Sequence, residues 1–376
     1  MFKNYNVLLI TLTYLSLFGL GLTDNLRGTL FPEFLKTFDL TSSLGAYIFI
    51  LTSCFSILAS FTSHRWLQKT DVIKVWRWGI LLMGFGALGF FLAPTFLLLL
   101  VGCASLGFGF GILAVTQNLL ITNVATPAKK QRVLSGLHSM YGFASLLSPL
   151  LVRELVPHQI PWRFLFLLAS SFIFLLYLST FLLPKKNEAK FEVKNILPLA
   201  TPKPSANGTL FLPIIIACYV SIELLISTRL TSYLIFYNKW TLAQASLYLT
   251  YFFIGLLMGR MAFTFFHPPI STKKMLLISL LGSLFLIVFG LQIDPIFLCL
   301  SGLLLAPFYP LAISLISEMY PHQVTSILSK TISFQSLFFI AMNFSVGYWT
   351  DLFGIASAMN AAFIFGGIAW IFLVKL

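Results

Sequence analysis

Charged residues are scarce in this chain. Asp, Glu, Lys and Arg together make up 9% of its 376 residues, whereas hydrophobic residues make up 58%. A soluble domain carries about 25% charged residues, so this composition cannot cover a water-exposed surface. The mean hydropathy of +0.93 agrees with that conclusion. The composition therefore excludes secreted, nuclear and cytosolic proteins, as well as collagen-like and disordered chains, and indicates an integral membrane protein.

Sequence signatures of enzymes and of ATP-driven pumps are also absent. The chain has no GxxxxGK[ST] phosphate-binding loop, no HExxH and no GxSxG. Its four cysteines lie inside apolar runs without the spacing of a metal site, so we interpret them as small buried apolar side chains. We therefore expect no enzyme activity, no cofactor and no metal ion. The basic loops lack aromatic stacking residues and do not indicate a nucleic-acid partner.

Long apolar runs divide the chain into twelve candidate helices. Each is roughly 20 residues or longer, which is the length needed to cross a hydrocarbon core of about 30 Å. A membrane β-barrel would show alternation with a period of two, which these runs lack. No small-residue cleavage site follows the first run, so we expect a span there and not a cleaved signal. The predicted helices are 6–31, 43–63, 73–93, 96–123, 132–155, 163–183, 211–236, 242–266, 274–292, 296–318, 325–348 and 354–374.

The positive charges predict the orientation of these helices. Most of the 24 Lys and Arg fall on one side of the membrane if the N-terminus is cytoplasmic. Because basic loops stay in the cytoplasm, both termini are expected there, in a multi-pass protein of the inner cell membrane. The Lys- and Pro-rich segment 184–210 cannot span a membrane and separates six helices from six. We predict an all-α membrane protein with an N-terminal six-helix bundle (1–183), a cytoplasmic linker (184–210) and a C-terminal six-helix bundle (211–376).

The two halves of the sequence resemble each other at an offset of about 202 residues. Arg27 then falls opposite Arg229, and the glycine run GFGFG at 107–111 falls opposite APFYP at 306–310. Weak similarity between halves is typical of transporters built from repeats, which bind their solute near the membrane midplane. The repeat predicts two pseudo-symmetric bundles with the solute site between them.

Several segments resemble the major facilitator superfamily, and the resemblance covers the whole chain. Four of them are similar to the fucose–galactose–glucose:proton symporter group: GFGFG in helix 4, LHSMYGFASLLSP in helix 5, GLLMGR in helix 8 and APFYPLAISLISEMYP in helix 10. The resemblance implies a proton-coupled transporter of sugar-like solutes, with helices 1, 4, 7 and 10 lining a central cavity. The GP-rich helix 5 motif of proton-driven drug antiporters is missing. Asp24 matches an acid that sugar symporters of this group carry in helix 1, whereas Gln117 and Asn118 stand where their second acid would lie.

Ionisable residues inside the predicted spans are few. Each costs about 2.5–3.5 kcal/mol at a helix centre, so such residues normally face a cavity or a partner. Asp24 and Arg27 are neighbours on one helix face. They form either a proton-sensitive acid held by Arg27 or a structural pair that fixes helix 1. Glu223 and Arg229 lie about 120° apart around helix 7, so we expect them to have different partners.

Polar residues also mark helices 4, 5 and 11. His138 and Tyr141 share one face of helix 5, where His138 either transfers a proton or only donates a hydrogen bond. Gln335 and Asn343 are their counterparts in helix 11. The predicted substrate-binding or proton-coupling residues are Asp24, Arg27, Gln117, Asn118, His138, Tyr141, Glu223, Arg229, Gln335 and Asn343.

A cytoplasmic gate is predicted from two further charges. Arg260 and Glu318 lie at similar depth near the inner ends of helices 8 and 10. We expect them to pair when the protein faces outward. In the alternative interpretation, Glu318 is a solvated acid at a helix end and Arg260 extends towards the cytoplasm.

Three hypotheses for the function remain open at this point. The first is a monomeric secondary active transporter in lipid that moves a small polar solute, a sugar or sugar-like molecule, by proton-coupled alternating access. The second is a transporter of organic anions, either carboxylates or phosphate esters, held by Arg27 and Arg229. The third is a non-transporting receptor on the same fold.

Overall fold

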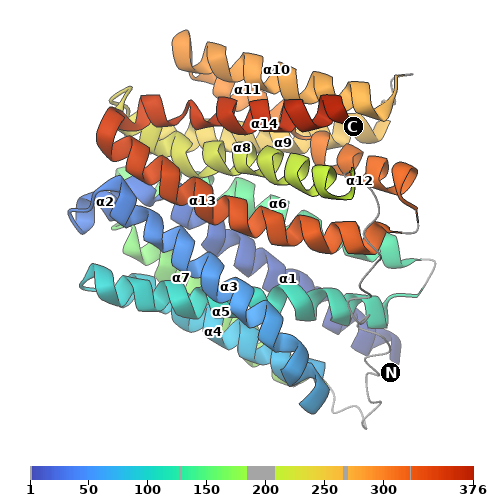
Figure 1. Cartoon of the computed structure of the whole chain (residues 1–376). Helices are drawn as coiled ribbons and strands as arrows, with labels where there is room; N and C mark the ends of the chain where they lie inside the picture. The colour runs from blue at the N-terminus through green and yellow to red at the C-terminus, as the bar shows by residue number, and fades with distance from the viewer. Residues whose placement is uncertain (1, 127–128, 184–207, 266–269, 322) are drawn as a thin grey trace. The chain divides into compact units, whose positions relative to one another are not determined.

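Helices form all the regular secondary structure in the residues that this computed structural model describes, which are 2–126, 129–183, 208–265, 270–321 and 323–376 (Figure 1). Two short 3-10 turns, Val156–His158 and Thr180–Leu182, follow α6 and α7. The α-helices are α1 Phe2–Thr29, α2 Phe31–Thr37, α3 Ser42–Lys69, α4 Val72–Leu92, α5 Phe96–Val124, α6 Lys130–Leu155, α7 Arg163–Ser179, α8 Gly208–Phe236, α9 Leu242–Phe265, α10 Thr272–Gln292, α11 Ile296–Leu305, α12 Phe308–Met319, α13 Val324–Ala358 and α14 Ala361–Lys375.

Most of these helices are long enough to cross a membrane. Within the described residues, ten segments are long and apolar enough to cross a membrane, and α11 and α12 together form one of them, Ile296–Met319. α6 has 26 residues but carries a more polar stripe, and α14 is a shorter apolar helix. With α6 and α14, the helices account for the twelve predicted runs, although α13 continues to Ala358, beyond the predicted end at 348, and α14 begins at Ala361 and not at 354. The all-α membrane fold is confirmed. The orientation of the termini stays a prediction.

Three interruptions separate helices where the apolar runs are continuous or nearly so. The chain breaks at Leu30, and α2 begins with Pro32 in its first turn, where the missing N–H has no intrahelical partner to lose. Pro307 lies between α11 and α12, because a proline inside a helix removes a hydrogen bond and clashes with the preceding turn. Gly354 adopts φ +81°, a conformation open to glycine, and ends the long part of α13.

The contacts divide the described helices into two units. One contains Met1–Arg27 and Tyr47–Ile196, and the other contains Gly28–Ala46 and Leu197–Leu376, as far as their residues are described. The second unit thus includes the end of α1, all of α2 and the first turn of α3. The predicted boundaries at 184–210 stay a prediction, because 184–207 lie outside the described residues.

Close helix contacts organise the first unit. α4 packs against both α5 and α7 (Figure 1). A Cβ atom on Gly109 of α5 would lie only 2.6 Å from the backbone nitrogen of Met83 on α4. Small residues at membrane-helix interfaces allow this approach. The glycine run 107–111 of α5 therefore serves helix packing at this position.

In the second unit, α8 packs against α13, α14 and α9 (Figure 1). α13 also holds the start of α3. The Asp351 carboxylate accepts hydrogen bonds from the backbone N–H groups of Ser42 at 2.7 Å and Ser43 at 2.9 Å. A carboxylate at a helix N-terminus satisfies donors that have no intrahelical partner. Asp351 therefore caps α3 from a distant part of the chain.

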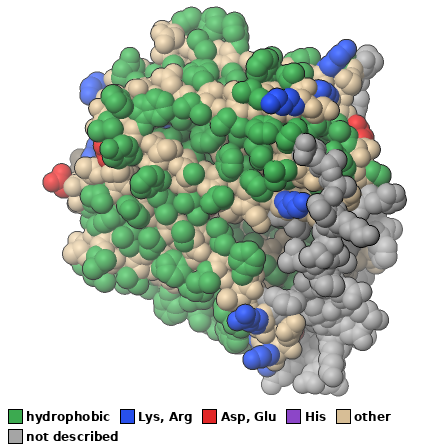
Figure 2. All heavy atoms as spheres, in the orientation of Figure 1, with side chains coloured by type: hydrophobic (Ala, Val, Ile, Leu, Met, Phe, Trp, Pro, Cys, Tyr) green, Lys and Arg blue, Asp and Glu red, His purple; other side chains and the backbone are tan. Residues whose placement is uncertain are grey.

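Hydrophobic side chains cover most of the face drawn in Figure 2, whereas Lys and Arg lie towards the ends of the helices. Large apolar side chains such as Phe61 and Leu97 are more than 70% exposed. Such exposure would be unfavourable in water but suits a surface that contacts lipid.

Candidate functional site

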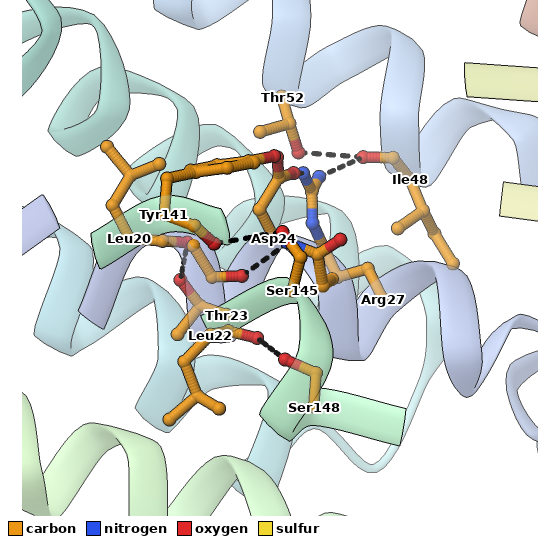
Figure 3. Close-up of polar contacts among 12 residues, drawn as sticks. Leu20, Leu22, Thr23, Asp24, Arg27, Ile48, Thr52, Tyr141, Ser145 and Ser148 are labelled. Atoms are coloured by element: carbon orange, nitrogen blue, oxygen red, sulfur yellow. Dashed lines mark hydrogen bonds and ion pairs between the residues drawn. The ribbon is translucent and has the colours of Figure 1, made fainter. Parts of the chain in front are cut away.

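Asp24 lies in a polar cluster of the first unit (Figure 3). One of its carboxylate oxygens pairs with the guanidinium of Arg27, one turn further along α1. The other accepts a hydrogen bond from the hydroxyl of Tyr141 on α6, at 2.6 Å. The Asp24 side chain nevertheless remains 32% exposed. The structure therefore brings together three of the predicted site residues around one accessible carboxylate.

Arg27 is the buried member of this cluster. Its side chain is only 3% exposed, and Nη1 donates to the Ile48 carbonyl at 3.3 Å. The guanidinium carbon lies 5.5 Å from the ring centroids of both Phe49 and Phe110. Aromatic rings attract a cation within about 6 Å. These contacts hold Arg27 in one place, although its Nε has no hydrogen-bond partner among the described residues.

Tyr141 reaches Asp24 because α6 lies close against α1. A Cβ atom on Gly21 would be 3.2 Å from the Tyr141 Cα, so the glycine permits the approach. Asn25 donates to the Ser145 hydroxyl at 3.0 Å. Ser148 donates to the backbone carbonyl of Leu22 in α1 at 3.2 Å (Figure 3). Hydrogen bonds between helices of this kind fix their register in an apolar environment.

The other predicted residues of the first unit have different surroundings. Gln117 is buried and donates to Ser16 at 2.9 Å, and Trp76 donates to the same hydroxyl at 3.2 Å. Asn118 donates to a carbonyl of its own helix at 2.8 Å. The His138 side chain is exposed. Among the described contacts, none of these three predicted residues joins the Asp24 cluster.

Glu223 is the centre of a second cluster, in the second unit. Tyr219, one turn earlier in α8, donates its hydroxyl to Glu223 Oε2 at 2.6 Å. Arg260 of α9 lies 3.4 Å from Oε1. Tyr219 is not among the predicted site residues, although its position four residues before Glu223 places both on one helix face. This four-residue spacing is the feature of the sequence from which the contact between Tyr219 and Glu223 could have been predicted.

Arg229 is buried and lies apart from Glu223. Its Nη2 donates to Asn343 Oδ1 at 2.8 Å, and its guanidinium carbon lies 4.1 Å from the Phe31 ring centroid. Glu223 and Arg229 contact different partners, as their six-residue spacing predicts. Gln335, the remaining predicted residue of α13, has a buried Nε2 with no partner among the described residues.

The predicted gate pair is not among the contacts that the described residues make. Arg260 faces Glu223, whereas Glu318 accepts a hydrogen bond from the Thr272 hydroxyl at 3.0 Å. Side chains on a helix lean towards its N-terminus, which directs Arg260 away from the C-terminal end of α9. The prediction concerns the outward-facing form and stays a prediction. A cavity lined by helices of both halves also stays a prediction.

Long apolar helices with charge clusters inside them define a multi-pass integral membrane protein. The family model described as the Major Facilitator Superfamily matches residues 13–334. The chain belongs to this family, which makes it a transporter and not an enzyme. No curated protein sequence matches the chain.

Several solved structures share the fold. A bacterial homolog of the human lysosomal transporter Spinster superposes with a TM-score of 0.80 at 11% identity, covering 100% of this chain and 96% of that one. A D-xylose–proton symporter superposes with a TM-score of 0.78 at 12% identity, covering 98% of this chain and 97% of that one. The E. coli fucose:proton symporter superposes with a TM-score of 0.64 at 18% identity, covering 97% of this chain and 98% of that one. At these identities the likeness shows the fold alone.

Proposed function

We propose that the protein is a secondary active transporter of the inner membrane. It moves a small polar solute, a sugar or sugar-like molecule, by proton-coupled alternating access. The observation that carries the proposal is Asp24, an accessible carboxylate within a membrane span that is held by Arg27 and Tyr141. An ionisable residue at such a position is costly and is usually tied to function. Among the structures with this fold are proton symporters of D-xylose and fucose.

Proton binding at Asp24 would change the balance of charge in its cluster. A protonated Asp24 no longer neutralises Arg27, which is buried between two aromatic rings. A buried cation without an anionic partner is unfavourable, so the cluster must rearrange or accept a polar group from the solute. This requirement links the proton on Asp24 to solute binding, which is what symport needs.

The test is transport in proteoliposomes with an inward proton gradient, using D-xylose and fucose as probes. Asp24→Asn should abolish accumulation against a concentration gradient while sparing counterflow, because accumulation needs the proton and counterflow does not. Glu33→Gln is a matched control, since Glu33 also pairs with a cation three residues on, Lys36 at 3.0 Å, but outside the cluster. Equal loss of both activities in Asp24→Asn would assign Asp24 to solute binding or folding and overturn the coupling role.

The organic-anion alternative has less support. Arg27 already pairs with Asp24, so an anionic solute would have to displace a carboxylate fixed in the same helix. A thermal-shift screen of sugars against organic anions at several pH values separates the two solute classes. Stabilisation by carboxylates or phosphate esters alone would favour the alternative, and binding without flux would favour a receptor.

A further inference from the structure

Each unit contains the same three chemical groups in contact. A carboxylate accepts a tyrosine hydroxyl at 2.6 Å and lies against a guanidinium, in Asp24 with Tyr141 and Arg27 and in Glu223 with Tyr219 and Arg260. The two clusters differ in which side chain is accessible. Arg27 is 3% exposed, whereas Arg260 is 50% exposed. A solute can therefore reach the arginine of the Glu223 cluster, but not the arginine of the Asp24 cluster.

One half of the Glu223 carboxylate is held firmly. Tyr219 is fully buried, and its ring stacks on Phe308 with a centroid separation of 4.4 Å and an interplanar angle of 11°. A ring held in this way leaves its hydroxyl little freedom to move. Tyr219 therefore fixes Oε2 of Glu223 and sets the direction in which Oε1 points.

The other half of the carboxylate faces a looser contact. The 3.4 Å separation between Arg260 Nη2 and Glu223 Oε1 exceeds the 2.7–2.9 Å typical of a strong charge-assisted hydrogen bond. An ion pair with a half-exposed arginine is screened and contributes little. A carboxylate oxygen accepts more than one hydrogen bond, and a guanidinium has five N–H donors. A ligand can therefore bind beside this pair, or between its members, at low cost.

We propose that Glu223 and Arg260 form a solute-binding subsite of the second unit and that Tyr219 is its positioning residue. The subsite takes two neighbouring hydroxyl groups of a polyhydroxy solute. One hydroxyl donates to Glu223 Oε1, and its neighbour accepts from Arg260. The inference rests on the proposed function, because it requires that a polar solute is carried. In the Asp24 cluster, by contrast, only the carboxylate is accessible, because the Arg27 guanidinium is buried beside Phe49 and Phe110.

The experiment measures the KM and maximal rate of counterflow in proteoliposomes for D-xylose, fucose and D-glucose. For any sugar that the wild type carries, Glu223→Gln and Arg260→Ala should each raise KM about tenfold, the effect of losing one hydrogen bond to a charged group. Arg260→Lys should recover part of the loss. The maximal rate of counterflow should change much less than KM, and Glu223→Gln should still accumulate sugar under a proton gradient.

Tyr219→Phe isolates positioning from packing, because it keeps the ring on Phe308 and removes only the hydroxyl. It should raise KM in the same direction as Glu223→Gln, with an unchanged melting temperature. Tyr233→Phe is the matched control, since Tyr233 is also buried in α8 and stacks on a neighbouring ring, that of Tyr237, but lies outside the cluster. Its KM should equal that of the wild type.

The outcomes separate the two proposals. If the wild type carries none of the three sugars, the proposed function fails and the subsite fails with it. If transport persists and the variants Glu223→Gln, Arg260→Ala and Tyr219→Phe keep the wild-type KM, the subsite alone is refuted. Loss of accumulation in Glu223→Gln without a change in KM would assign Glu223 to the proton and also refute the subsite.

Discussion

The stability of the Asp24 cluster provides a sharp test of how the charges are balanced. Asp24→Ala removes the anion and leaves Arg27 as a buried cation at 3% exposure. Arg27→Ala instead leaves a carboxylate that is 32% exposed and still accepts the hydroxyl of Tyr141. The two substitutions break the same pair, but only the first leaves a buried charge. The double substitution removes both charges.

The expected size of the effect follows from the surroundings of Arg27. Breaking a buried pair by removing one partner costs about 3–5 kcal/mol. Two aromatic rings at 5.5 Å remain beside the guanidinium and each contributes about 0.5–1 kcal/mol. Asp24→Ala should therefore lower the free energy of unfolding by about 1–4 kcal/mol. The double substitution should be more stable than Asp24→Ala by about 1 kcal/mol or more, in spite of the side-chain volume it removes.

The assay is thermal and denaturant unfolding of the four purified proteins in one detergent, analysed as a double-mutant cycle. A double variant as unstable as Asp24→Ala, or less stable, would refute the reasoning. That result would mean that Phe49, Phe110 and the Ile48 carbonyl stabilise the Arg27 charge without Asp24.

Three further predictions concern the packing of α5 on α4, the cap on α3 and the hydrogen bond of Tyr141. Gly109→Val should destabilise the first unit by about 1–3 kcal/mol, because its Cβ would meet backbone of α4. Gly142→Ala, with no atom within 4 Å, should not destabilise the protein in the same unfolding assay, because Ala is the better helix former. Asp351→Ala should cost about 1 kcal/mol as a lost helix cap, and increased amide hydrogen exchange at the start of α3 would locate the effect. Tyr141→Phe should lower the unfolding midpoint, since a hydrogen bond to a charged group contributes about 1.5–3 kcal/mol; an unchanged midpoint would show that this bond adds nothing to stability.

The number of spans, and the limits of many of them, could be predicted because a bilayer demands continuous apolar length. The predicted helix 96–123, for example, is observed as Phe96–Val124. The break at Pro307 was not predicted, since the residues on both sides of it are apolar and hydropathy does not register a lost backbone hydrogen bond. Local chain geometry, and not composition, decides such interruptions.

Contacts between site residues could be predicted only where the residues share a helix. Asp24 and Arg27 are three residues apart, so helical spacing alone places them together. The partner of Arg260 depends on how α9 is rotated against α8. The spacing of residues within one helix cannot predict that rotation. Gln117 shows a second limit, because a polar residue in an apolar helix indicates a buried partner but does not say whether that partner is a ligand or, as here, Ser16.

The cap on α3 has a consequence for biogenesis. The backbone N–H of Ser42 finds its acceptor in Asp351, 309 positions later in the chain. Synthesis proceeds from the N-terminus, so α3 enters the membrane long before α13 exists. During that interval the Thr41 hydroxyl, which accepts from the Leu44 N–H at 3.3 Å, is the local cap that the helix retains, and water at the membrane surface must satisfy the rest. The N-terminal end of α3 is therefore completed late. A chain truncated before α13 would leave this end of α3 without the Asp351 carboxylate.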